Sequence, residues 1–156
     1  MEKENPKQRL SSSALQRKKF DSDEYPQSEQ TSRVIGAAVE VHRALGPGFL
    51  EAVYEEALSL ELESRKIPYE RQRLVRVYYR GSTVGVHKID LITEGKVVVE
   101  LKAVKAIEDV HLAITLSYLK ATNLPVGLII NFAEATLRVR RVARGGRVFT
   151  AEAQKS

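Results

Sequence analysis

The segment from Val126 to Phe132 (VGLIINF) is apolar at nearly every position. A strand with one wet face alternates apolar and polar side chains, whereas a strand covered on both faces reads as an unbroken apolar run. This segment therefore predicts a central strand with helices on both sides. That requirement makes the chain an α/β protein, with layers above and below a sheet.

The remaining periodicities supply the other elements. Apolar residues at helical spacing predict helices over 32–45 and 50–65, which Gly46-Pro47-Gly48 separates. Thr31 or Ser32 is expected to cap the first of these helices. Further strands are expected at 75–79, 84–93, 96–104 and 137–142, and a third helix at 109–121. The predicted order is α-α-β-β-β-α-β-β, which is a mixed central β-sheet flanked by helices.

With 156 residues the chain suits one domain, which we place at 31–144. Residues 1–30 are rich in Ser, Gln, Lys and Glu and show no apolar period, so we expect a disordered N-terminal tail. A flexible C-terminal tail is expected at 145–156.

The chain has no cysteine, which excludes a disulfide framework, a thiolate zinc site and a cysteine nucleophile. No apolar run approaches the roughly 20 residues of a membrane span, so we expect a cytoplasmic protein with no membrane partner. The net charge of +5 favours an anionic partner.

Two predicted strands carry acidic residues at one hairpin. Asp90 lies on the first strand, and Glu100-Leu101-Lys102 lies on the second. Alternation places Ile89 and Leu91 on the face opposite Asp90, and places Glu100 and Lys102 together on one face. A three-residue loop at 94–96 would set Asp90 directly across from Glu100, whereas a two-residue loop would put them on opposite faces. Gly95 suits the three-residue form.

Two carboxylates held that close repel each other, and a divalent cation is the simplest compensation. Mg²⁺ (or Mn²⁺) takes one or two carboxylates together with waters and phosphate oxygens. The carbonyl of Leu101 could add a further ligand to Asp90 and Glu100. Water bound to such an ion loses its proton more easily. Lys102 would orient that water or stabilise an anionic transition state.

An Asp, a short hairpin and Glu-x-Lys together resemble the PD-(D/E)xK nuclease superfamily. A second signature is Gly48-Phe49-Leu50-Glu51-Ala52-Val53-Tyr54, which matches the motif after which the GxxExxY protein family is named. The resemblance extends over about 32–142. It implies a PD-(D/E)xK nuclease-like core in which Glu51 joins Asp90 and Glu100 at the metal.

The same resemblance implies substrate-orienting roles for Tyr54, His111 and Tyr118. Many members of the superfamily carry Gln-x-x-x-Tyr on the helix after Glu-x-Lys, and here Ile114 stands at the Gln position. Each role has a structural alternative: Tyr54 would pack its helix onto the sheet, and His111 would cap a helix. His42 is expected to be structural, and His87 is expected to have no role.

Two arginine sets could track a nucleic-acid backbone. One contains Arg138, Arg140 and Arg141, and the other runs from Arg71 to Arg80. The alternative is protection of an edge strand by charge. No basic surface rich in aromatic residues is apparent, so a platform for stacking single strands is not indicated.

The leading hypothesis is a small nuclease that hydrolyses phosphodiester bonds of nucleic acid with metal-activated water. The alternative is a catalytically inactive nuclease-fold module that binds nucleic acid or a protein partner. A weaker rival is a Glu51/Glu100 acid–base pair that cleaves a sugar bond. DNA or RNA, and a monomer or a homodimer that grips both strands of a duplex, stay open.

Overall fold

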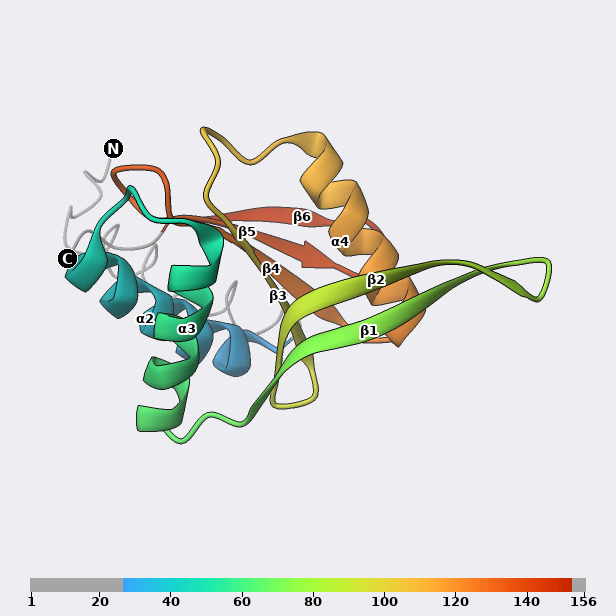
Figure 1. The fold of residues 1–156 in the computed structure, drawn as a ribbon, viewed down its shortest axis with the longest axis horizontal. Coiled ribbons are helices and arrows are strands. Elements are labelled where there is room, and N and C mark those ends of the chain that lie inside the picture. Colours follow the sequence, from blue (N-terminus) through green and yellow to red (C-terminus); the bar gives the residue numbers. More distant parts are fainter. Residues whose placement is uncertain (1–26, 153–156) are drawn as a thin grey trace, which may run out of the picture.

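The computed structural model of the chain describes residues 27–152 as helices and strands around one sheet (Figure 1). The helices are α2 (Ser28–Leu45), α3 (Glu51–Ser64) and α4 (Asp109–Thr122). The strands are β1 (Tyr69–Tyr79), β2 (Ser82–Thr93), β3 (Val97–Lys102), β4 (Val126–Asn131), β5 (Arg138–Ala143) and β6 (Val148–Glu152). The predicted α/β class and the order of the elements are confirmed, and β6 is an additional strand within the stretch expected to be a tail.

The six strands lie in the order β1-β2-β3-β4-β5-β6, so neighbours in the sequence are neighbours in the sheet. Only β3 and β4 pair in parallel, and α4 makes the crossover between them. The other pairs are antiparallel. Helices α2 and α3 cover one face of the sheet and α4 covers the other (Figure 1).

Strand β4 is buried on both faces, as its apolar run predicts. Leu128 and Ile130 pack with α2 and α3, whereas Ile129 packs with Leu119 of α4. Gly127 lets α4 come close to the sheet, because a Cβ atom there would lie 2.6 Å from Cγ2 of Thr115.

Helix α2 begins earlier than the sequence predicts. Thr31 lies inside the helix, where its hydroxyl donates to the carbonyl of Ser28 at 3.1 Å, so neither Thr31 nor Ser32 is the cap. The reason is a tertiary contact: Arg141 on β5 donates to Oγ1 of Thr31 at 2.7 Å and ties the first turn to the sheet. Residues 1–26 of the predicted N-terminal tail lie outside the described residues, but 28–30 are helical.

The predicted faces of β2 are wrong at one position. Ile89 packs on the α4 face of the sheet, whereas Leu91 packs on the α2–α3 face. Arg71 pairs with Leu91 and Arg73 pairs with Ile89, but Gln72 between them adopts the left-handed conformation (φ 53°). This distortion beside Asp90 breaks the regular alternation of the pleat.

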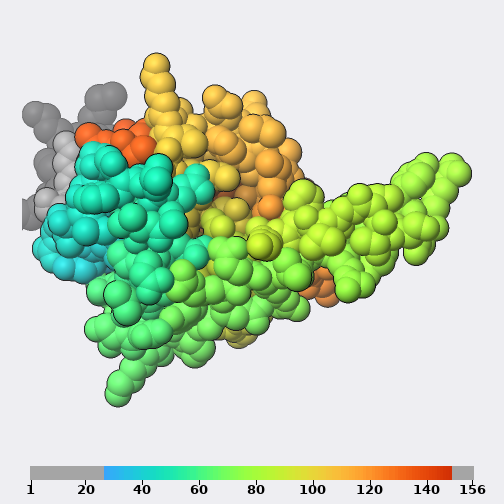
Figure 2. Space-filling view, in the orientation of Figure 1, coloured from blue at the N-terminus to red at the C-terminus, as the bar shows by residue number. Residues whose placement is uncertain are grey.

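The β1–β2 hairpin extends well beyond the sheet and forms an arm on the molecule (Figures 1 and 2). Several of its apolar side chains are exposed, among them Leu74, Val84 and Val86. Among the described helices, none combines the length and apolar character needed to cross a bilayer.

Candidate functional site

The turn between β2 and β3 sets the register that brings two acidic residues together. Glu94, Gly95 and Lys96 form a three-residue loop, in which Glu94 (φ 53°) and Gly95 (φ 64°) are left-handed. Leu91 pairs with Val99, so the next position along the hairpin places Asp90 beside Glu100. This is the register that the three-residue loop predicts.

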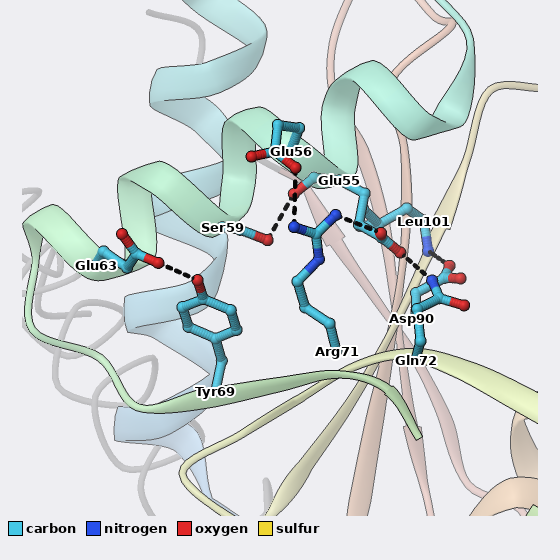
Figure 3. Close-up of polar contacts among 9 residues, drawn as sticks. All are labelled: Glu55, Glu56, Ser59, Glu63, Tyr69, Arg71, Gln72, Asp90 and Leu101. Carbon is cyan, nitrogen blue, oxygen red and sulfur yellow. Dashed lines mark hydrogen bonds and ion pairs between the residues drawn. The ribbon is translucent and has the colours of Figure 1, made fainter. Parts of the chain in front are cut away.

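Asp90 and Glu100 are linked crosswise. The backbone N–H of Asp90 donates to Oε1 of Glu100 at 3.2 Å. The N–H of Leu101 donates to Oδ2 of Asp90 at 2.9 Å, and Figure 3 shows this second bond. Both carboxyl groups are therefore held in place by the backbone of the opposite strand. The hairpin itself fixes the pair.

The electrostatics of this pair are unfavourable for two ionised acids. Glu100 is 6% exposed, and burial followed by the charge of Asp90 raises its pKa to about 8. Burial also raises the pKa of Asp90, against the lowering effect of the N–H bond from Leu101. Lys102 on the same strand lowers the pKa of both groups. Strongly raised carboxyl pKa values of this kind are typical of functional sites.

Helix α3 brings further carboxylates to the pair. Glu51, its first residue, accepts from the N–H of Ala103, just beyond β3, at 3.4 Å. Glu55 lies one helical turn later on the same side of α3. The charges of Glu55 and then Glu51 each raise the pKa of Asp90. Sequence reasoning found Glu51 but missed Glu55, although the spacing of four residues is a signal that could have indicated it.

Glu55 is held by two residues of β1. Arg71 donates to it through Nη2 at 2.8 Å, and Gln72 donates through Nε2 at 2.5 Å. Arg71 also bonds Glu56 at 2.8 Å. Figure 3 shows the Gln72 side chain next to Asp90, at the distorted point of β1. This network ties α3 to the strands that carry the acidic pair.

The donor set fits a divalent cation held by few protein ligands. Within residues 27–152, no group of three or more His, Cys, Asp and Glu side chains is placed so that it could hold a metal ion. Mg²⁺, however, needs only one or two carboxylates and keeps waters for the rest of its shell. The buried Glu100 and the half-buried Asp90, which repel each other, are the anionic partners that such an ion would neutralise. Leu101, expected to offer its carbonyl, is seen here to donate its N–H to Asp90.

Tyr54 is a core residue in this structure, which fits the packing alternative, and its substrate-orienting role stays a prediction. Its hydroxyl donates to the carbonyl of Gly46 at 2.6 Å and accepts from the N–H of Phe49 at 3.2 Å. Its ring is fully buried and stacks on Phe132 with centroids 4.4 Å apart. Tyr54 therefore holds the turn before α3 onto the core.

His111 takes the capping alternative. Its Nδ1 accepts from the N–H of Glu108 at 2.8 Å, and the Glu108 carboxylate accepts from the His111 backbone in return. Both bonds stabilise the start of α4. His42 is structural, as expected, because its Nε2 bonds the carbonyl of Glu134 at 2.9 Å.

Tyr118 lies near the acidic pair. It is almost buried on the α4 face, and burial followed by the charges of Glu100 and Asp90 raises its pKa. Ile114, at the position where the superfamily often has Gln, is 37% exposed one turn earlier on α4.

The arginine sets are largely engaged within the protein. Arg141 is only 7% exposed and bonds Thr31, so burial removes it from the predicted nucleic-acid surface. Arg138 pairs with Glu134 at 3.6 Å, and Arg140 is half-buried. Arg73 of the second set pairs with Glu70 at 3.3 Å.

A mixed sheet between helices, with acidic residues gathered at a hairpin and a helix start, defines the class of nuclease-like α/β folds. A sequence profile of the PD-(D/E)XK nuclease superfamily matches residues 28–142. The chain belongs to that superfamily. Neither a curated protein nor a solved structure matches it at a significant level. The closer resemblance to GxxExxY proteins stays a prediction.

Proposed function

We propose that this protein is a metal-dependent nuclease that hydrolyses phosphodiester bonds. The observation that carries the proposal is the crosswise Asp90–Glu100 pair, with Glu100 buried, Asp90 half-buried and the pKa values of both carboxyls raised. A fold has no need to hold two repelling acids at a buried hairpin for stability alone. Membership of a nuclease superfamily gives the pair its chemical context.

In this proposal Asp90 and Glu100 hold Mg²⁺ or Mn²⁺, with assistance from Glu51 and from the Leu101 carbonyl. When bound, such an ion would acidify water and offset charge that develops on a phosphate. Glu100 would have to be ionised to hold such a cation, because metal ligands must be deprotonated.

The remaining work falls to groups of the chain itself. Lys102 shares the face of Glu100 on β3 and is half-buried, so its ammonium can stabilise negative charge on the phosphate oxygens. Glu55 keeps the start of α3 close to Asp90 through its bonds to Arg71 and Gln72. Lys102 neutralises charge and Glu55 positions the start of α3. Positioning and charge stabilisation are the main contributions that a protein makes to phosphoryl transfer.

The test is cleavage of plasmid DNA, single-stranded DNA and RNA by pure protein, with Mg²⁺, with Mn²⁺ and with a chelator. Asp90→Asn and Lys102→Met should each lower turnover about 100-fold or more. Lys105→Met is the matched control, since Lys105 is an exposed lysine three residues beyond Lys102. Unchanged turnover in both site variants would refute this assignment of the site. Hydrolysis of a glycoside substrate in the presence of the chelator, without cleavage of nucleic acid, would favour sugar-bond cleavage by the Glu51/Glu100 pair instead.

A second candidate function is a binding module without catalysis. It is favoured by Ile114, which offers no polar group where many relatives of the superfamily have Gln, and by the small number of protein ligands at the pair. Tight, salt-sensitive binding of nucleic acid with no cleavage under any metal condition would select this candidate.

A further inference from the structure

Tyr118 packs in the same core cluster as Ile89, the residue before Asp90, and it lines a cavity of about 370 Å³ between α4 and the β1–β2 hairpin. This volume falls within the roughly 300–1,000 Å³ of small-ligand sites. The lining of this cavity includes Val75, Arg76, Tyr78, His87, Tyr118 and Lys120. We call this cavity the hairpin pocket.

The hairpin pocket is lined by aromatic and apolar side chains. His87 and Tyr118 form an edge-to-face pair with centroids 5.6 Å apart. Val75, which also lines the pocket, is buried, whereas Tyr78 leaves 62% of its surface exposed. Flat faces of this kind are the surfaces on which nucleobases stack, whatever the base.

The charged groups at the pocket are cations. Arg76 comes from β1 and Lys120 comes from α4, so they approach the opening from two different elements. Among the described residues that line the pocket, none is acidic. A ligand with an aromatic body and an anionic backbone matches this distribution.

We propose that the hairpin pocket receives one unpaired nucleobase of a nucleic-acid strand whose phosphate lies at Asp90 and Glu100. This inference rests on the proposed function, and it adds the substrate class. A paired base would have to leave its stack to enter, so single strands and locally unpaired segments bind in preference to a regular duplex. The aromatic platform that the sequence does not reveal is built from three separate elements of the fold.

The experiment measures binding of the full chain to labelled single strands and to their duplexes, with Ca²⁺ as the cation. Tyr78→Ala should weaken binding of the single strand about ten-fold, because one stacked face is lost. Tyr79→Ala is the matched control, because Tyr79 is 61% exposed on the same strand but does not line the pocket. Its effect should stay within about two-fold.

A strand with abasic residues identifies the bound group. It should bind wild-type protein about as weakly as the complete strand binds Tyr78→Ala, and Tyr78→Ala should weaken its binding no further. Equal effects of the two tyrosine variants, or equal binding of strand and duplex, would overturn the proposal. If a free nucleoside monophosphate binds as tightly as the single strand, the claim that one continuous strand reaches from the hairpin pocket to Asp90 and Glu100 would be overturned.

Cleavage by the same wild-type preparation separates this inference from the proposed function. If wild-type protein cleaves nucleic acid and Tyr78→Ala leaves the binding of single strands unchanged, only the proposal for the hairpin pocket would be refuted. Binding that depends on Tyr78 and on the base, without cleavage under any metal condition, would refute the nuclease proposal and keep the pocket.

Discussion

Asp90 and Glu100 each accept a hydrogen bond from the backbone of the other's strand, at 2.9 Å for Asp90 and 3.2 Å for Glu100. These bonds hold the two carboxyls together although burial and like charge oppose their ionisation. The hairpin therefore holds two carboxyl groups whose mutual repulsion is reduced when either a proton or a cation binds. Several measurable consequences come from that repulsion and from the packing around it.

Replacement of one acid should stabilise the protein when no cation is present. Asp90→Asn keeps an oxygen that can accept from the Leu101 N–H but removes one charge. We expect its melting temperature in chelator at pH 8 to rise by about 3–6 °C, which corresponds to a gain on the order of 1–2 kcal/mol. Mg²⁺ should then raise the melting temperature of wild type more than that of the variant.

Glu70→Gln serves as the control for this measurement, since Glu70 is an exposed acid that pairs only at the surface with Arg73. Its melting temperature should stay close to that of wild type. A fall in stability for Asp90→Asn under chelation would contradict the claim that the two acids repel in the native protein.

Stability without metal should fall as the pH rises from about 4.5 to about 8. The pKa of Glu100 is raised to about 8 in the folded protein, so over this window the native state keeps a proton that the unfolded state releases. Stability falls with pH wherever the native state binds more protons. Asp90, Glu51 and Lys102 face this carboxyl, and the raised pKa of Asp90 acts in the same direction.

Urea unfolding in chelator at several pH values measures this slope. Glu100→Gln should flatten it by an amount on the order of a few kcal/mol across the window. An identical slope in wild type and Glu100→Gln would show that Glu100 titrates at its ordinary pKa.

Removal of the Tyr54 hydroxyl should affect stability and leave chemistry intact. Tyr54→Phe leaves the Gly46 carbonyl and the Phe49 N–H without this partner, at a cost of about 1 kcal/mol. The ring can still stack on Phe132. We expect a lower melting temperature and turnover within about two-fold of wild type. A large loss of turnover with unchanged stability would support the substrate-orienting role.

A Cβ atom at Gly127 should collide with α4. Gly127→Ala would place that atom 2.6 Å from Cγ2 of Thr115, so we expect a loss of about 1–3 kcal/mol in urea unfolding. Thr115→Ser removes Cγ2 and keeps a hydroxyl that can bond the His111 carbonyl. The double variant should regain much of the stability, and simple additivity of the two losses would exclude this contact as the cause.

Local patterns were enough to predict the three helices, five of the six described strands and the register at the site. Helical and alternating periodicity gave the order of helices and strands, and Gly95 indicated the loop length that sets Asp90 beside Glu100. Both are short-range properties of the sequence.

Contacts between distant segments could not be predicted in the same way. Arg141 and Thr31 are 110 positions apart, so nothing near either residue shows that the arginine is buried against α2. Gln72 adopts the left-handed conformation although it is not a glycine, so the local sequence does not indicate it. This conformation accompanies the placement of Ile89 and Leu91 on opposite faces of the sheet. The hairpin pocket likewise depends on β1, β2 and α4 meeting in space.

The parallel pairing of β3 with β4 also orders events during synthesis. Glu51, Asp90 and Glu100 are all synthesised before Val126–Asn131, so the strand that carries Glu100 waits for its parallel neighbour until α4 and β4 have been made. A nascent chain that lacks β4 cannot bury the acids or bring Tyr118 against them. Any hydrolytic capacity of this protein therefore arises only after most of the domain has been synthesised.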